Sequence, residues 1–301
     1  MSLLVIGATG LVGSKFVSDA SGKAQVIPAD ENHIDVTNVN SINNFFLDND
    51  FDSVINFAAI TDVDAAEKER ENKSGLVWKL NGEGAHNLAE ACKKFDKFLV
   101  HISTDFVFPG TVDNPGPYSE DSPLPNQLMF GLGWYGWSKN RAEEFITLSQ
   151  AKHAIVRISY PFYADTFENK FDFAKNYLNL FDQGKLYPLF NDQVFTPLLV
   201  DELAEPLLRI IQLRASGVYH IVSSNTTTPF EFTKYLLKKA RGVENVVQES
   251  SMQDFLKSGG KTPRPRLGGL RTEITQKKLG LKFKTWQEMV DEFTDQYQKS
   301  P

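Results

Sequence analysis

The stretch GATGLVG, residues 7–13, is the part of the sequence that decides the fold class. A short apolar run at residues 3–6 precedes it, and a segment with helical spacing follows at residues 11–20. Glycine recurs at every third position, where a tight turn, the close approach of a pyrophosphate and close packing of a helix on a strand each need a small residue. Free amides and the helix dipole then attract the anion. The predicted contacts to a dinucleotide are Gly7, Thr9, Gly10, Leu11, Val12 and Gly13.

An acidic residue follows the next apolar run, residues 24–29. Asp30 stands where a carboxylate accepts hydrogen bonds from both hydroxyls of an adenosine ribose and repels a 2′-phosphate. Glu31 comes next, and no Lys or Arg stands nearby in the sequence to bind that phosphate. The sequence therefore favours NAD(H) over NADP(H) as the cofactor.

Apolar runs and helical segments alternate through the first half of the chain. The runs are continuous, which is typical of parallel strands that are buried on both faces. The predicted strands are residues 3–6, 24–29, 53–57, 98–102 and 154–158. The predicted helices are residues 11–20, 39–48, 72–95 and 134–150. This alternation predicts an α/β fold, a Rossmann-type doubly wound parallel sheet.

The second half is less regular and predicts a smaller C-terminal α/β lobe. Its predicted elements are a helix at 200–214, a strand at 218–222 and short helices at 273–279 and 285–298. Residues 258–270 are too rich in Gly and Pro for regular structure. We expect a dinucleotide-binding Rossmann domain at residues 1–160, to which residues 196–222 return, and a substrate-binding lobe at residues 161–301.

Candidate catalytic residues lie in two places. Thr104 follows the predicted strand at 98–102, at the sheet edge where open α/β sheets bind ligands, so its hydroxyl can hydrogen-bond a reacting carbonyl oxygen. Tyr135 and Lys139 lie four residues apart at the start of a predicted helix and project from one face. We expect the ammonium to lower the pKa of the tyrosine from its usual value of about 10, which would make Tyr135 an acid–base catalyst. Lys139 can also hold the ribose of a nicotinamide.

Composition excludes several classes of function. The chain has 32 Lys plus Arg and 38 Asp plus Glu, so its formal charge is −6 and offers no basic face for nucleic acid or an anionic membrane. Cys92 is the only cysteine, and the histidines lack metal-ligand spacing, so we expect neither a disulfide nor a metal site. No apolar run reaches the roughly 20 residues of a membrane span. The first residues lead directly into a strand, so we expect a cytoplasmic protein.

Taken together, these motifs resemble the dTDP-4-dehydrorhamnose reductase-like family of the extended short-chain dehydrogenases/reductases. The resemblance covers nearly the whole chain. Its segments include NFAAITDVDAAE (56–67), HISTDFVFPG (101–110), YGWSK (135–139) and TPRPRLGGLRT (262–272). It implies an NAD(P)-dependent oxidoreductase that reduces a keto group on a nucleotide-activated sugar, and it is compatible with a homodimer.

The resemblance also implies roles for individual residues. The implied catalytic set is Thr104, Tyr135 and Lys139. Further implied cofactor contacts are Asp30, Asp35, Val36, Phe57, Ala58, Ala59, Asn81, Tyr135 and Lys139. The implied substrate contacts are Thr61, Val63, Asp105, Phe106, Tyr160, Arg264 and Arg266. Arg264, Arg266 and Arg271 are the best diphosphate clamp that the sequence offers, although a solvated basic loop fits the same pattern.

The chain departs from the family on the substrate side. The family usually has Tyr and Trp where this chain has Phe106 and Tyr160. Dehydratases of the same superfamily carry an Asp-Glu pair after the threonine, and Phe106 occupies the position of that Glu. Without a second acid, reduction is favoured over elimination of water. Two alternatives stay open: a dinucleotide-binding regulatory subunit like the β subunit of methionine adenosyltransferase, and a nucleotide-sugar epimerase.

Overall fold

The computed structural model describes residues 1–129, 131–165, 172–258 and 262–297. Its centre is a parallel sheet of six strands in the order β2-β1-β3-β4-β5-β9. The strands are β1 (Ser2–Ile6), β2 (Gln25–Ala29), β3 (Ser53–Asn56), β4 (Phe98–Thr104), β5 (His153–Ile158) and β9 (Gly217–His220). After β2 the chain crosses to the other side of β1, so the strand order reverses between β1 and β3. Ligands of open α/β sheets bind at such a point.

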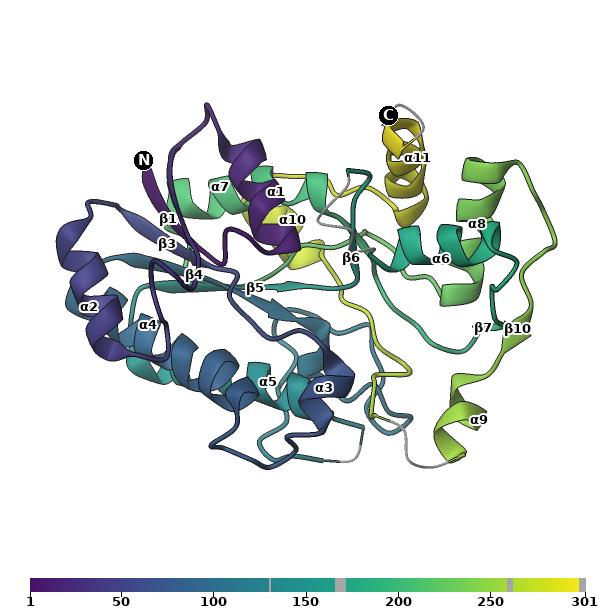
Figure 1. The fold of residues 1–301 in the computed structure, drawn as a ribbon, viewed down its shortest axis with the longest axis horizontal. Coiled ribbons are helices and arrows are strands. Elements are labelled where there is room, and N and C mark those ends of the chain that lie inside the picture. The colour runs from purple at the N-terminus through teal and green to yellow at the C-terminus, as the bar shows by residue number, and fades with distance from the viewer. Residues whose placement is uncertain (130, 166–171, 259–261, 298–301) are drawn as a thin grey trace.

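Helices cover both faces of the sheet (Figure 1). One face carries α1 (Leu11–Ala20), α7 (Ala204–Leu213) and α10 (Glu273–Leu279). The other face carries α2 (Val39–Asp48), α4 (Gly84–Lys94) and α5 (Trp134–Ser149). Each layer has its own apolar core: Leu3, Val5 and Phe16 are buried on the first face, and Leu4, Ile6 and Leu88 on the second. The expected doubly wound α/β fold is therefore confirmed.

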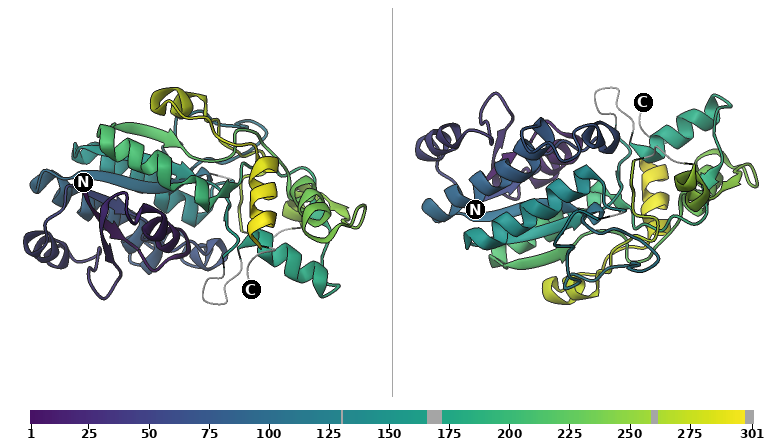
Figure 2. Two further views of the ribbon diagram at one scale, coloured as in Figure 1. Left: turned by 90° about the horizontal axis from the view of Figure 1, so that it is seen from above. Right: turned by 90° about the horizontal axis from the view of Figure 1, so that it is seen from below.

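A second group of elements packs beside the carboxyl ends of the strands. It contains α6 (Phe173–Asp182), α8 (Pro229–Arg241), α9 (Met252–Lys257) and α11 (Trp286–Tyr297). Its short strand pairs are β6 (Pro161–Phe162) with β8 (Leu198–Leu199), and β7 (Leu189–Phe190) with β10 (Glu249–Ser250). Figure 2 shows α11 between the large sheet and α8. Phe162, Phe232, Trp286 and Phe293 lie in one apolar cluster that joins α6, α8 and α11.

Some elements differ from the sequence-based expectation. The helix expected at 72–95 begins as a π-helix, Trp78–Glu83, before α4. In this wider turn Asn81 exchanges two hydrogen bonds with the backbone of Ile60, at 2.8 and 3.0 Å. Helices α6 and α8 were not predicted from the sequence. Residue 298, at the end of the expected helix 285–298, lies outside the described residues.

The described residues contain no helix that is long and apolar enough to cross a membrane. The same residues contain no group of three His, Cys, Asp or Glu side chains that could hold a metal ion.

Candidate active site

The glycine-rich loop lies between β1 and α1. Gly7 adopts a positive φ of 77°, and Gly10 N donates a hydrogen bond to Gly7 O at 3.1 Å, which closes the turn. A methyl group at position 13 would lie 2.2 Å from the carbonyl oxygen of Gly7, so only glycine lets the helix begin this close to the strand. The N-terminus of α1 therefore opens directly onto the cleft, as an anion site requires.

Acidic side chains follow β2 and line the same cavity as this loop. Asp30 Oδ1 accepts a hydrogen bond from Asn32 N at 2.9 Å and lies 2.6 Å from His33 Nδ1. The His33 interaction holds the pKa of Asp30 below its usual value, so this carboxylate is ionised. Asp35 is held by Thr37, whose backbone and hydroxyl donate to its Oδ1 at 2.9 and 2.7 Å. The arrangement offers acceptors to ribose hydroxyls.

Tyr135 lies in the first turn of α5, against the short 3-10 helix η2 (Asp105–Val107) that follows β4. A methyl group at position 136 would lie 2.1 Å from the carbonyl oxygen of Phe106. Gly136 therefore lets α5 approach η2 closely, and it brings the Tyr135 ring to 5.9 Å from the ring of Phe106. Burial raises the pKa of Tyr135 to about 12, Asp105 adds to this effect, and the Thr104 hydroxyl opposes it. Tyr135 is thus a neutral phenol at physiological pH.

Lys139 is almost completely buried one turn further along α5. Its Nζ donates to the carbonyl oxygen of Ile102 at 2.7 Å and lies 2.9 Å from His101 Nε2. Burial lowers the pKa of Lys139 to about 7, although the charge of Glu143 acts in the opposite direction. The structure thus differs from the expectation that Lys139 lowers the pKa of Tyr135, because the lysine is directed at β4 and is itself hard to ionise.

The expected substrate side is lined by aromatic rings and one buried acid. Tyr160 has a φ of 42°, a left-handed conformation that is strained for a side chain of this size. Its hydroxyl accepts a hydrogen bond from Gln193 Nε2 at 2.8 Å, and its ring lies 6.2 Å from that of Phe106. Burial raises the pKa of Asp105 to about 6, against hydrogen bonds that include one from Thr104. An acid, a hydroxyl and a phenol therefore meet at this end of β4.

Residues 262–271, here called the Pro-Arg loop, carry two arginines that pair with acids. Arg264 Nη2 lies 2.8 Å from Oδ2 of Asp64, a residue of the short helix α3 (Val63–Glu67). Arg266 Nη1 lies 3.7 Å from Asp192 Oδ2. As expected, the described part of residues 258–270 contains no helix and no strand.

Two adjoining cavities contain most of the residues singled out in the sequence. The first, of about 480 Å³, is lined by Gly7, Gly10, Leu11, Val12, Gly13, Phe57, Ala59, Thr61, Val63, Thr104, Asp105, Phe106, Tyr135, Lys139, Tyr160 and Arg264. The second, of about 390 Å³, is lined by Gly7, Thr9, Gly10, Asp30, Asp35, Val36, Phe57, Ala58 and Ala59 among others. Shared residues such as Gly7 and Phe57 make the two cavities neighbours along the edge of the sheet.

Three expected site residues line neither cavity: Asn81, Arg266 and Arg271. Asn81 is buried, where its Nδ2 donates to Ser138 Oγ at 3.0 Å, and Arg266 pairs with Asp192. Conversely, Pro161 and Asp172 line the first cavity although the sequence analysis did not select them. Asp172 accepts a hydrogen bond from Lys175 N at the start of α6, so its position before a helix was the one signal available.

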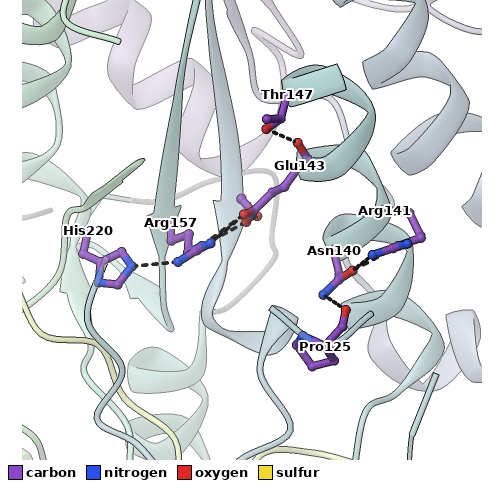
Figure 3. A network of polar contacts seen from close by, with 8 residues as sticks. Pro125, Asn140, Arg141, Glu143, Thr147, Arg157 and His220 are labelled. Atoms are coloured by element: carbon purple, nitrogen blue, oxygen red, sulfur yellow. Dashed lines mark hydrogen bonds and ion pairs between the residues drawn. The ribbon is translucent and has the colours of Figure 1, made fainter. Parts of the chain in front are cut away.

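A buried ionic network connects the end of β4 with α5 and β5 (Figure 3). Ser103 Oγ donates to Glu143 Oε1 at 2.5 Å, and Arg157 Nη2 lies 2.7 Å from Glu143 Oε2. Arg157 Nη1 also lies 3.2 Å from His220 Nε2, and His220 Nδ1 lies 2.7 Å from the carbonyl oxygen of Arg271. Burial lowers the pKa of His220 to about 3, so the ring is neutral and its Nδ1 donates to Arg271. The network thus joins β4, α5, β5 and β9 to the end of the Pro-Arg loop.

A parallel sheet, a glycine loop at the reversal of strand order and a Tyr/Lys pair beside the same cavity define a Rossmann-type dinucleotide-binding protein of the short-chain dehydrogenase class. Comparison with known proteins identifies the family. The RmlD substrate binding domain family matches residues 1–299, and the chain belongs to this family. The resemblance noted in the sequence is confirmed.

Individual relatives are similar over their whole length. The chain is 28% identical to the spore coat polysaccharide biosynthesis protein SpsK of Bacillus subtilis, over 97% of this chain and 96% of that protein. A dTDP-4-dehydrorhamnose reductase structure from Clostridium acetobutylicum superposes with a TM-score of 0.85 and 28% identity, over 99% of this chain and 100% of that one. A dTDP-4-dehydrorhamnose reductase structure from Bacillus anthracis, in complex with NADP, gives 0.83 and 27%, over 97% and 98% of the two chains.

Proposed function

We propose that this protein reduces a keto group on a nucleotide-activated sugar with a nicotinamide dinucleotide as cofactor. The observation that carries the proposal is the meeting of Thr104, Tyr135 and the glycine-rich loop in one cavity. Family membership and relatives named as reductases support it. The raised pKa of Tyr135 favours reduction as the direction of the reaction, because a neutral phenol can donate a proton to a ketone oxygen.

The residues present fit a dinucleotide. The cleft offers the N-terminus of α1 to a diphosphate and the Asp30 carboxylate to a ribose, and Gly13 lets α1 begin close to β1. When bound, the cofactor supplies the hydride. Thr104 orients the carbonyl oxygen, Tyr135 Oη gives it a proton, and the aromatic rings of Phe106 and Tyr160 exclude water from the reacting carbon.

Neither alternative class is favoured. Elimination of water, a reaction outside these two alternatives, is not favoured either, because Phe106 provides no second acid beside Asp105. The Thr104 hydroxyl lies within hydrogen-bonding reach of Tyr135, where it opposes the rise in the pKa of this tyrosine. A regulatory subunit that only binds dinucleotide would not need this contact. The reductase names of the relatives favour reduction over epimerisation as well.

The direct test measures oxidation of NADH and NADPH by the purified protein across a set of nucleotide-linked 4-keto-sugars. The matched control is the same sugars without the nucleotide. We expect oxidation with at least one nucleotide-linked ketone and little with the free sugars. Loss of the signal across the whole set, together with a partner protein that co-purifies, would support the regulatory alternative.

The two parts of the chain have different proposed roles. We propose that residues 1–160, together with residues 196–222, bind the cofactor and that most of residues 161–301 binds the sugar nucleotide. The pairing of β9 with β5 supports the return to the sheet. Leu279 and Phe283 pack in the apolar core of the sheet, so we assign the segment around α10 to the first part.

We propose that NAD(H) is preferred to NADP(H), because the ionised Asp30 would repel a 2′-phosphate. Asp30→Ala should narrow the gap between the two affinities, mainly by strengthening NADPH binding. Isothermal titration calorimetry of the parent and the variant measures both. The control is Asp48→Ala, which removes an exposed carboxylate at the end of α2. Equal affinities in the parent, or a gap that Asp30→Ala leaves unchanged, would contradict the assignment.

We also propose that Arg264 exchanges Asp64 for the diphosphate of the substrate. Arg264→Ala should raise the Michaelis constant for a nucleotide-linked ketone about tenfold to a hundredfold, the range expected when a charge-assisted hydrogen bond is lost. NADH affinity should stay the same. Arg241→Ala is the matched control, because Arg241 forms a similar ion pair with Asp182 on α8 and α6. An unchanged Michaelis constant would place the diphosphate elsewhere.

A further inference from the structure

Helix α5, which carries Tyr135, begins after a glycine. The first amides of a helix have no acceptor within the helix, and a Ser, Thr, Asp or Asn side chain at the preceding position usually supplies one. Gly133 occupies this position and has no side chain that could do so. A methyl group on it would lie 2.9 Å from the carbonyl oxygen of Pro263, so the packing of the Pro-Arg loop leaves room for glycine alone. The start of α5 therefore needs an acceptor from elsewhere in the chain.

The acceptor is the carboxylate of Glu67, the last residue of α3. Its Oε2 accepts a hydrogen bond from the backbone N–H of Trp134, the first residue of α5, at 2.8 Å. Its Oε1 accepts from Arg70 Nη1 at 2.7 Å, so each oxygen has a partner. Arg70 Nη1 also lies 3.4 Å from the carbonyl oxygen of Leu132. The negative charge of Glu67 thus lies at the positive end of the α5 dipole, where it is stabilising.

Apolar packing holds the two partners of this hydrogen bond in place. Ala66, the residue before Glu67, is fully buried, and Trp134 is 1% exposed. The Trp134 ring stacks on that of Trp78, with 5.5 Å between the ring centroids. Ala66, Trp134 and Tyr135 belong to the same apolar cluster. The contact therefore joins two packed segments that lie 67 residues apart in the sequence.

Tyr135 follows Trp134 directly, so a contact that fixes the Trp134 backbone also fixes where the phenol begins. Val63, at the start of α3, lines the same cavity as Tyr135, so α3 and α5 both border the site. We propose that Glu67 is a positioning residue: its hydrogen bond to the Trp134 amide fixes the start of α5 and thereby the place of the Tyr135 hydroxyl in the cavity. The effect on turnover rests on the proposed function, whereas the placement of the ring does not.

Two substitutions of Glu67 separate the hydrogen bond from the charge. Glu67→Met removes both oxygens from an unbranched side chain of similar length, whereas Glu67→Gln keeps an oxygen that can accept from Trp134 N. We expect turnover of a nucleotide-linked ketone to fall about tenfold to a hundredfold in Glu67→Met, the range for a reacting group displaced by about 1 Å. Glu67→Gln should turn over nearly as fast as the parent. Glu67 lines neither cavity, so the affinity for NADH should stay the same in both variants.

A double-mutant cycle distinguishes the positioning of Tyr135 from a general disturbance of the cavity. If Glu67 acts through the phenol, Glu67→Met should cost little further turnover in a protein that already carries Tyr135→Phe. An equal loss in the two backgrounds would overturn the proposal. Glu69→Met is the matched control, because Glu69 Oε2 also accepts a hydrogen bond from a backbone N–H, that of Val77, at 2.9 Å. We expect its turnover to match that of the parent.

Nuclear magnetic resonance tests the placement of the ring without turnover. The chain has 4 Trp and 9 Tyr, so nitrogen-15 labelling of tryptophan and carbon-13 labelling of tyrosine rings give few signals. The signals of Trp134 and Tyr135 are identified as those lost in Trp134→Phe and Tyr135→Phe. In Glu67→Met we expect the Trp134 amide hydrogen to exchange faster with solvent and the Tyr135 ring signal to shift. Both should stay close to the parent in Glu67→Gln and in Glu69→Met.

Three further results would overturn the proposal. The first is a Trp134 amide that exchanges in the parent as fast as an amide without an acceptor, a measurement that does not require a folded Glu67 variant. The second is a Tyr135 ring signal that stays in place in Glu67→Met while the Trp134 amide loses its protection. The third is a loss in Glu67→Gln as large as that in Glu67→Met, which would assign the effect to the ion pair with Arg70. Failure of the parent to reduce any ketone would count against the proposed function, while the resonance signals would still decide whether Glu67 places Tyr135.

Discussion

Turnover of a nucleotide-linked ketone should fall by about 10²-fold or more when Tyr135 is replaced by Phe, the range typical of lost general-acid catalysis. The substitution removes the hydroxyl that, in the proposed mechanism, gives a proton to the ketone oxygen. It keeps the ring, and with it the edge contact to Phe106 and the packing of α5 on η2. Steady-state oxidation of the reduced cofactor, together with a binding titration, measures turnover and cofactor affinity separately.

The control for this variant is Tyr219→Phe. Tyr219 is also a buried tyrosine, but it lies on β9, outside both cavities, and its hydroxyl makes one long contact of 3.4 Å to Ser216 O. We expect its turnover to match that of the parent. Turnover of Tyr135→Phe at the rate of the parent would show that another group supplies the proton, and Asp105, with a pKa of about 6, would be the next candidate.

The largest expected loss of stability follows from Glu143→Gln. Glu143 and Arg157 are both nearly inaccessible, with side chains 3% exposed, so removing the carboxylate leaves a guanidinium charge buried without its counter-ion. Breaking a buried pair in this way costs about 3–5 kcal/mol of folding free energy. Chemical denaturation of the parent and the variant measures the difference in their free energies of unfolding. The comparison requires that both proteins show the same dependence of this free energy on denaturant concentration.

Glu144, the residue after Glu143 on α5, provides a matched control. Glu144 pairs with Arg141 but is 42% exposed, and such surface pairs contribute about 0–1 kcal/mol. Glu144→Gln should therefore unfold close to the parent. If Glu143→Gln also loses less than about 1 kcal/mol, the network in Figure 3 contributes little to the stability of the fold.

Much of the first half could be predicted because its signals are local. The glycine spacing of residues 7–13 reflects a turn and a helix start that lie within one loop, and continuous apolar runs indicate buried parallel strands whatever their order. The second half gave weaker signals. Helix α8 carries a cap signal, Thr228 followed by Pro229 and Glu231, which the sequence analysis overlooked.

The sequence alone identified several residues of the cleft, because positions that follow parallel strands or begin their helices share one edge of the sheet. Asp30, Thr104 and Tyr135 were identified in this way. It could not determine their protonation. Only the tertiary structure surrounds Tyr135 with apolar groups and Asp105, and only it pairs Lys139 with a histidine from another strand. Ionisation depends on burial and on neighbours that are distant in sequence, so the electrostatic state of the site was decided by the folded structure.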